Sequence, residues 1–162
     1  TNPVLGSFPV LDVFVQVACH LARGGSLDVI GKPADVLKEL VEFKPRILNE
    51  GKTIVGSVIY IDNFGNVITN IEKHLFEAYR NGRNFELSAR NKILTEIYHT
   101  YSDIINFKLD KNQRKGPGDL LALFNSAGFI ELAIYKSDSQ TVGSAATLLG
   151  LEYRDTITIN FF

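Results

Sequence analysis

Short apolar stretches separated by turn-forming residues dominate the chain from Thr53 onward. The stretches are rich in β-branched and aromatic residues, and turn formers such as Asn81-Gly82 and Gly116-Pro117-Gly118 interrupt them. Short strands at this spacing are typical of an antiparallel barrel or sandwich. The pattern therefore predicts a mainly antiparallel, barrel-like domain, with strands at residues 53–61, 66–70, 84–89, 93–98, 120–124, 130–135 and 156–161.

Three segments have the spacing of helices instead. Residues 11–22 carry an apolar stripe that ends at Gly24-Gly25. A second helix is predicted at about residues 71–80 with Asn70 as its N-cap, and a short third helix after Gly143. Residues 45–51 look like a linker. The predicted fold class is α+β, with one part at residues 1–45 and a barrel-like domain at 46–162.

Composition excludes several classes of protein. A formal net charge of −1 provides no basic surface for nucleic acid, and no apolar run approaches the roughly 20 residues that span a bilayer. The single cysteine excludes an internal disulfide and fits a reducing, cytoplasmic setting. Apolar neighbours predict that the Cys19 thiol is buried on a helix. We therefore expect a soluble cytoplasmic protein with neither nucleic-acid nor membrane partners.

Metal-dependent and serine-hydrolase chemistry also find no support in the sequence. The chain has no P-loop, no H-E-x-x-H pair and no G-x-S-x-G turn. Its three histidines, His20, His74 and His99, lack the spacing of metal ligands. The charged loop at residues 110–115 has no aromatic partner and is expected to be solvated. No metal is predicted.

The run from Tyr60 to Ile71 carries the strongest functional signal. Two apolar stretches flank Asp62, Asn63, Phe64, Gly65 and Asn66, which bring a carboxylate, an aromatic ring and a carboxamide into one short turn. Asx residues and glycine also form turns for purely conformational reasons. A structural turn and a binding loop both remain open on this evidence.

Two further segments accompany that run, Asn125–Ala133 and Gly143–Leu151. The three together resemble the S-adenosylmethionine hydroxide adenosyltransferases, the family that includes fluorinases and chlorinases. Its C-terminal pattern reads I-D-x-F-G-N-x-x-T-N-I, then N-S-x-G-x-L-E-I-A, then G-x-A-A-x-L-L-G-L. Ser7 to Ala22 resembles the segment that ends the family's larger α/β N-terminal domain. The resemblance implies that residues 1–45 end that domain, and that most of it lies upstream of this chain.

The resemblance also implies a site for S-adenosylmethionine (SAM). Asp62 would contact the methionine amino group, and Asn125 with Ser126 its carboxylate; a carboxylate and a hydroxyl suit these partners chemically. An aromatic ring and a carboxamide suit a purine face and edge. The resemblance places the remaining contacts at Phe64, Asn66 and Tyr101 for adenine, at the backbone of Ser144, Ala145 and Ala146 for the purine edge, and at Ser7 and Phe8 beside the reaction centre.

The implied reaction is displacement at C5′ of the ribose by water or halide, with methionine as leaving group. It uses SAM as substrate and needs no cofactor. In this family the site forms between neighbouring subunits of a homotrimer, so this chain would hold the C-terminal half of each site. The first expectation is therefore a SAM hydrolase that yields adenosine and L-methionine.

Departures from the family pattern keep other functions open. Hydrolases read T-F-H-G-R-D where this chain has Ser7-Phe8-Pro9-Val10-Leu11-Asp12, so the usual histidine and arginine are replaced. No catalytic residue is assigned here. Extra residues after Ile134, with Tyr135 in place of asparagine, lie beside the expected adenine edge. The alternatives are a non-catalytic SAM or adenosine binding protein, a SAM-dependent halogenase, or a purely structural barrel.

Overall fold

The computed structural model describes residues 8–34, 36, 43–137 and 143–162. The chain divides into two compact units, Thr1–Val41 and Glu42–Phe162. Each unit is described by itself below.

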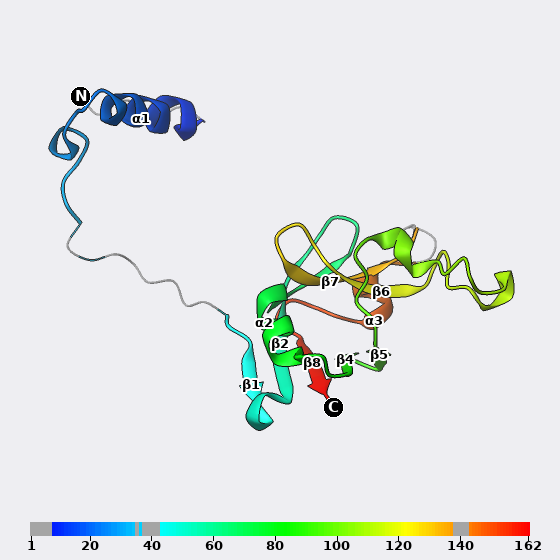
Figure 1. Cartoon of the computed structure of the whole chain (residues 1–162). Helices are drawn as coiled ribbons and strands as arrows, with labels where there is room; N and C mark the ends of the chain where they lie inside the picture. Colours follow the sequence, from blue (N-terminus) through cyan, green and yellow to red (C-terminus); the bar gives the residue numbers. More distant parts are fainter. Residues whose placement is uncertain (1–7, 35, 37–42, 138–142) are drawn as a thin grey trace. The chain divides into compact units, whose positions relative to one another are not determined.

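The first unit is a helical segment without a core among its described residues. A π-helical turn, Val10–Phe14, leads into α1, Val15–Ala22, and a 3₁₀ turn follows at Leu27–Val29 (Figure 1). None of the residues in these elements is buried. The predicted helix is present, but the prediction of a buried Cys19 thiol is wrong: Cys19 is exposed. An apolar stripe buries its residues only where a second surface packs against it.

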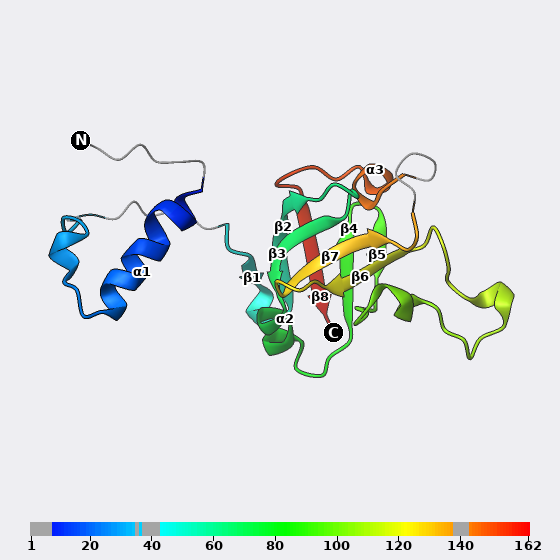
Figure 2. The ribbon, with the colours of Figure 1, turned by 90° about the horizontal axis from the view of Figure 1, so that it is seen from above.

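The second unit is a nearly closed antiparallel β-barrel (Figures 1 and 2). Neighbouring strands follow the order β5-β4-β8-β2-β3-β7-β6, and β1 pairs with β2. A parallel bridge between Tyr98 and Leu123 brings the segment after β5 against β6 and nearly closes the barrel. The predicted α+β, barrel-like fold is confirmed. The strands are β1 Arg46–Leu48, β2 Thr53–Ile61, β3 Val67–Glu72, β4 Phe85–Ala89, β5 Lys92–Leu94, β6 Leu120–Phe124, β7 Phe129–Ile134 and β8 Thr156–Phe161.

Helix α2, Lys73–Arg80, supplies the aromatic centre of the core. Its Phe76 is fully buried, and the ring centroids of Phe85, Phe124 and Phe161 lie 5.0, 5.6 and 5.6 Å from that of Phe76. These rings come from three different strands. Burial of large aromatic side chains is a dominant source of core stability, so Phe76 joins the helix to the barrel.

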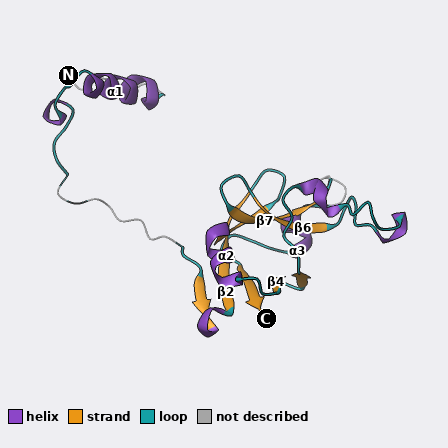
Figure 3. Cartoon of the chain, in the orientation of Figure 1, coloured by secondary structure: helices purple, strands orange, loops and turns teal. Residues whose placement is uncertain are grey.

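The structure corrects three local predictions, and Figure 3 shows the strands and helices concerned. Residues 45–51 are not a linker, because β1 and a 3₁₀ turn at Asn49–Gly51 occupy them. Strand β5 ends at Leu94 rather than continuing to residue 98. Asn70 is not a helix cap: it lies in β3, where its Oδ1 accepts from Ser57 N at 2.8 Å and its Nδ2 donates to Phe43 O. Tertiary hydrogen bonds decide such polar positions, and local pattern does not report them.

Side chains of β3 and β7 alternate between the core and the outer face of the barrel. Val67 pairs with Leu132 in the core, and Ile68 pairs with Glu131 on the outer face. A bulge between Val58 and Tyr60 puts Tyr60 opposite Ile68, so Tyr60 belongs to the same outer face. A second small cluster covers the outer face of β6 and β7, where Ile104 of the 3₁₀ turn Tyr101–Ile104 packs with Leu121, Leu123, Ala133 and Tyr135.

Candidate functional site

The β2–β3 turn is held together by the Asp62 carboxylate. Asp62 Oδ1 accepts from the backbone N–H groups of Phe64 and Asn66, at 2.9 and 2.8 Å, and Oδ2 accepts from Asn66 Nδ2 at 3.0 Å. Backbone bonds from Gly65 N to Asp62 O and from Asp62 N to Asn66 O complete the turn. The Phe64 ring points to solvent and is 76% exposed. The turn therefore presents an exposed aromatic ring beside a half-buried carboxylate and carboxamide.

This turn packs against the start of α3, Ala145–Leu149. Ala146 N donates to Gly65 O at 3.0 Å, and a Cβ added to Gly65 would overlap Ser144 Oγ and Cβ. Gly65 has φ of 75°, a conformation that other residues rarely adopt. Ser144 caps the helix and is buried. Because Gly65 has no side chain, the first and third sequence motifs come into direct contact.

Tyr101 and Glu131 form the neighbouring part of the site. Glu131 lies in the middle of β7 and is 6% exposed, and its Oε1 accepts a hydrogen bond from the Tyr101 hydroxyl. Burial raises the pKa of Tyr101, and the hydrogen bond to Glu131 and the negative charges of Glu131 and Asp62 raise it further. The Tyr101 hydroxyl therefore remains a neutral donor near pH 7. The hydrogen bond to Glu131 holds the Tyr101 side chain at β7, where Glu131 pairs with Ile68 of β3.

The Tyr101 turn has its own anchor. Thr100 and Asp103 form a capping box, in which Asp103 Oδ2 accepts from Thr100 N at 2.9 Å. The backbone hydrogen bond from Thr100, followed by that from its side chain, lowers the pKa of Asp103. A capping box satisfies free backbone donors at both ends of a first helical turn. The box thereby fixes the segment that carries Tyr101.

The β6–β7 turn is built differently and lies elsewhere. Asn125 Oδ1 accepts from Ala127 N and Phe129 N, both at 3.1 Å, so Asn125 stabilises its own turn. Ser126 is exposed and borders a pocket of about 430 Å³. Lys73 and Arg80 of α2 and His99 line the same pocket. Serine with two cationic side chains is a suitable surface for a carboxylate.

The two turns lie at opposite ends of the β3–β7 pair. Asp62 is next to Ile61, which pairs with Val67, whereas Gly128 O accepts from Lys73 N beyond the pairing of Glu72 with Phe129. From Leu132 to Phe129 the strand alone spans about 10 Å. Asp62 and Ser126 of one chain therefore cannot both contact the two charged groups on a single amino-acid carbon.

The structure thus unites some predicted site residues and separates others. Asp62, Phe64, Asn66, Tyr101, Ser144, Ala145 and Ala146 gather around one end of the barrel, and Asn125 and Ser126 lie at the other. Phe8 belongs to the first unit and is 69% exposed, and Ser7 lies outside the described residues. Of the backbone amides at the start of α3, Ser144 N donates to Thr147 Oγ1 and Ala146 N to Gly65 O. Within the described residues this leaves Ala145 N to meet a ligand.

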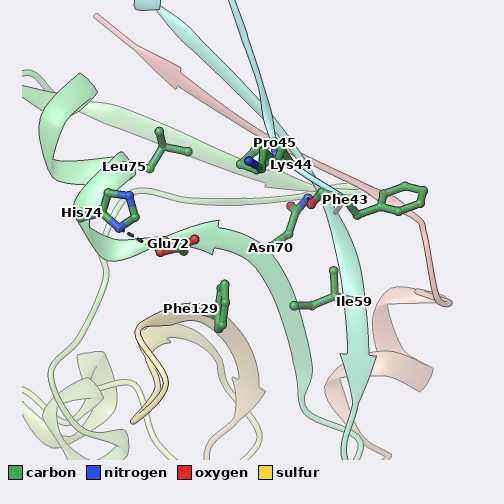
Figure 4. A pocket seen from close by; sticks show the side chains of 9 residues that line it. All are labelled: Phe43, Lys44, Pro45, Ile59, Asn70, Glu72, His74, Leu75 and Phe129. Carbon is green, nitrogen blue, oxygen red and sulfur yellow. Dashed lines mark hydrogen bonds and ion pairs between the residues drawn. The ribbon is translucent and has the colours of Figure 1, made fainter. Parts of the chain in front are cut away.

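Another pocket, of about 580 Å³, lies on the outer face beside the segment Phe43–Pro45 (Figure 4). Ile59, Leu75 and Phe129 contribute apolar walls, and Glu72 contacts His74 Nδ1 at 2.9 Å. Asn70 reaches across its floor but already uses its amide in the two structural hydrogen bonds given above. The sequence motifs gave no signal for this pocket.

Sequence reasoning also gave no role to Glu131, Lys73 or Arg80. Glu131 was detectable in principle, since it is the only charged residue in the otherwise apolar strand Phe129–Ile134. A charge in a buried strand requires a partner or a function. Lys73 and Arg80 lie near the β6–β7 turn because β3, which α2 follows directly, pairs with β7 up to Phe129, and no local pattern reports that pairing.

Metal and membrane features are limited to what the described residues show. Across residues 8–34, 36, 43–137 and 143–162, no three His, Cys, Asp or Glu side chains gather closely enough to hold a metal ion. No helix in the same part of the chain has the length and apolarity to cross a bilayer.

Comparison with known proteins assigns the chain to a family. Residues 56–158 match the family model described as the SAM hydroxide adenosyltransferase C-terminal domain. An (R)-S-adenosyl-L-methionine hydrolase of Methanocaldococcus jannaschii is 29% identical over 152 residues, covering 91% of this chain and 46% of that protein. A protein of the same name from Salinispora tropica is 27% identical over 157 residues, covering 96% of this chain and 51% of the relative. The chain thus spans about half the length of these relatives.

Solved structures share the fold of this chain. An uncharacterized conserved protein from Thermotoga maritima has a TM-score of 0.63 and 27% identity, over 99% of this chain and 55% of that one. A conserved hypothetical protein from Thermus thermophilus has a TM-score of 0.50 and 24% identity, over 95% of this chain and 52% of that one, and supports the fold alone. Because the matched domain covers most of the barrel and carries all three motifs, this chain belongs to the SAM hydroxide adenosyltransferase family and contains its C-terminal domain.

Proposed function

We propose that the complete protein hydrolyses S-adenosylmethionine to adenosine and L-methionine, with this chain supplying the C-terminal part of the site. One observation carries the proposal: the Asp62–Asn66 turn and the start of α3 are in direct contact at one end of the barrel, although they come from distant parts of the sequence. The names of the two hydrolase relatives indicate the (R) epimer at sulfur as the substrate.

The adenosine end of the ligand fits the β2–β3 turn. Asn66 Nδ2 donates one hydrogen bond to Asp62, so its second N–H and its Oδ1 remain able to read a purine edge. Phe64 offers an exposed ring for stacking, and Tyr101 a partly exposed one. Ala145 N adds a backbone donor. This combination provides both a face and an edge for adenine.

The methionine end has two candidate positions. Asp62 has three hydrogen bonds within its turn and can accept a further one from an ammonium group. Ser126, with Lys73 and Arg80 nearby, suits a carboxylate but lies beyond the far end of β3 and β7. A ligand extended along the outer face, from Asn66 toward Ser126, would use the second position for its carboxylate.

The reaction would be an in-line displacement at C5′: the oxygen of water bonds to C5′ and releases one proton, and the C5′–S bond breaks with its electron pair on sulfur, so that the sulfonium leaves as a neutral thioether. A sulfonium needs no proton to leave, so the protein would contribute alignment and exclusion of bulk water. We infer that the upstream part of the protein, from a neighbouring subunit of a homotrimer, completes each site. Sedimentation of the complete protein, followed by mixing of two singly inactive variants, would test this arrangement through restored activity.

A second candidate is a SAM or adenosine binding protein without catalysis. It is favoured by Pro9 and Leu11, which stand where the family's hydrolases keep histidine and arginine. Neither side chain can take up a proton or stabilise a charge. A SAM-dependent halogenase would share the displacement and differ only in its nucleophile.

Product analysis separates these functions. The complete protein is incubated with each sulfur epimer of SAM, with and without halide, and the nucleosides are identified by mass spectrometry. Adenosine with methionine supports the hydrolase, and a 5′-halo nucleoside would replace it with a halogenase. Unchanged SAM with measurable binding would support the non-catalytic alternative.

A further inference from the structure

Glu131 is a buried charge in an apolar strand. The residue is 6% exposed, and its neighbours along β7 are all apolar, namely Phe129, Ile130, Leu132, Ala133 and Ile134. Its Oε1 accepts from Tyr101, and no other hydrogen bond to its carboxylate occurs within the described residues. Within the described residues, no fully buried side-chain oxygen lacks a hydrogen-bond partner. Tyr101 thus holds one oxygen of the carboxylate, and no other described residue donates a hydrogen bond to the group.

The position of Glu131 in the barrel relates it to the proposed ligand. It pairs with Ile68, two residues along β3 from Asn66, and Tyr60 lies opposite Ile68 on the other side. Directly paired residues share a face, so Glu131 and Tyr60 both belong to the outer face. Two residues of strand correspond to about 7 Å. Glu131 therefore lies partway between the adenine subsite at Asn66 and the β6–β7 turn that carries Ser126.

The middle of S-adenosylmethionine is its sulfonium, which joins the ribose to the amino-acid chain. A sulfonium is a permanent cation and donates no conventional hydrogen bond. An anion and aromatic faces are the groups that stabilise such a cation in a partly desolvated site. Glu131 supplies the anion, and Tyr60 and Tyr101 supply aromatic rings. Glu131 and Tyr60 both lie opposite Ile68, between Asn66 and the β6–β7 turn.

We propose that Glu131 is the counter-charge for the sulfonium of S-adenosylmethionine and that Tyr101 positions it. The proposal rests on the proposed function, since it assumes that adenine binds beside Asn66. It makes Glu131 the residue that distinguishes SAM from S-adenosylhomocysteine, which differs in having a neutral thioether. The protein would then bind SAM in preference to S-adenosylhomocysteine, the product that methyltransferases form from SAM.

The test is a titration of the complete protein with SAM, S-adenosylhomocysteine and adenosine, with products followed by mass spectrometry in the same samples. Glu131→Gln keeps the size and the acceptor for Tyr101 but removes the charge. The affinity for SAM should fall by about tenfold or more, which is the effect of losing a buried charge-assisted contact. The affinities for S-adenosylhomocysteine and adenosine should not change. Glu72→Gln is the matched control, because Glu72 lies on β3 at the far end of the same outer face. It should change none of the three affinities.

Tyr101→Phe provides a second route if Glu131→Gln does not fold. It retains the ring and the Glu131 charge but frees the carboxylate, so the ratio of SAM to S-adenosylhomocysteine affinity should fall while adenosine binding persists. An equal loss of SAM and S-adenosylhomocysteine, or no loss in either variant, would overturn the sulfonium assignment. Wild-type protein that neither binds nor converts SAM would instead overturn the proposed function, and this inference with it.

Discussion

The two hairpin turns at the ends of β3 and β7 look alike in sequence but differ in what surrounds them. Each has an Asx residue that accepts backbone N–H bonds and a glycine with positive φ, 75° at Gly65 and 84° at Gly128. Gly65 lies directly against Ser144, whereas a side chain at Gly128 would meet nothing within 4 Å. The first turn packs closely against the start of α3, whereas the second meets the start of α2 through the bond from Lys73 N to Gly128 O and leaves its glycine uncovered. Turn chemistry alone therefore does not distinguish a binding loop from a connection.

The largest expected difference between the turns concerns their glycines. Gly65→Ala adds a clash with Ser144 to the strain of a left-handed residue, and should lower the free energy of unfolding by about 3 kcal/mol or more. Gly128→Ala incurs only the strain, about 1–2 kcal/mol. Urea denaturation of both variants measures this difference. Equal losses would show that the β2–β3 turn is not packed against α3 as described.

The second expected difference concerns binding of the amino-acid group. Asp62→Asn keeps an oxygen for the backbone bonds but removes the charge. With the ammonium group at Asp62, the binding free energy of SAM should weaken by about 1.5–3 kcal/mol and that of adenosine much less; with the ligand extended past Glu131 toward Ser126, neither should change much. Ser126→Ala tests the opposite end of the barrel with the same two ligands. Equal weakening of SAM and adenosine by Asp62→Asn would contradict the ammonium contact. A selective loss in Ser126→Ala would place the carboxylate at the β6–β7 turn.

A smaller difference should separate the two asparagines. Asn125→Ala removes the acceptor for two backbone N–H groups and should cost about 1 kcal/mol of stability without changing adenosine affinity. Asn66→Ala removes a proposed ligand contact and should weaken the binding free energy of adenosine by about 1 kcal/mol. The free energy of unfolding should change little. Thermal unfolding and isothermal titration of both variants report the two quantities. Loss of stability alone in Asn66→Ala would identify the β2–β3 turn as purely structural.

The smallest expected effect concerns the capping box that holds Tyr101. The pKa of Asp103 is lowered by its hydrogen bonds to Thr100, so its stabilisation is fully present above the ordinary aspartate value of 3.8 and is lost as pH falls through the lower folded value. The melting temperature of Asp103→Asn should therefore lie below that of the wild type near pH 7, and the two melting temperatures should converge below pH 3.8. A difference that persists at lower pH would assign the effect to something other than this carboxylate.

Much of the barrel was predictable because its signals are local. Strands β2, β6 and β8 have the predicted bounds, and β3, β4 and β7 lie within one or two residues of them, since alternation and turn residues act over a few positions. The capping role of Asn70 and the burial of Cys19 were wrong for one reason: each depends on a partner surface distant in sequence. Asn70 bonds to Ser57 and Phe43, and no described residue of the first unit buries Cys19.

The candidate site divides in the same way. Sequence motifs identified Asp62, Phe64, Asn66 and the start of α3, and the register of β2, β3 and β7 brings their segments together. The same register separates Asn125 and Ser126 from them, although all were expected in one site. Glu131 was within a recognised motif without a role, because only its hydrogen bond to Tyr101 shows what its charge faces.

By itself, the sequence determined the family, the barrel class and the composition of the turns, because residue type, spacing and local backbone preference suffice for these. Only the tertiary structure decided which turns meet, which face of β7 bears Glu131 and which residues lack a partner surface. Strand register and packing against distant elements make those decisions. They bring the β2–β3 turn onto α3 and leave the glycine of the β6–β7 turn without a neighbour within 4 Å of an added side chain.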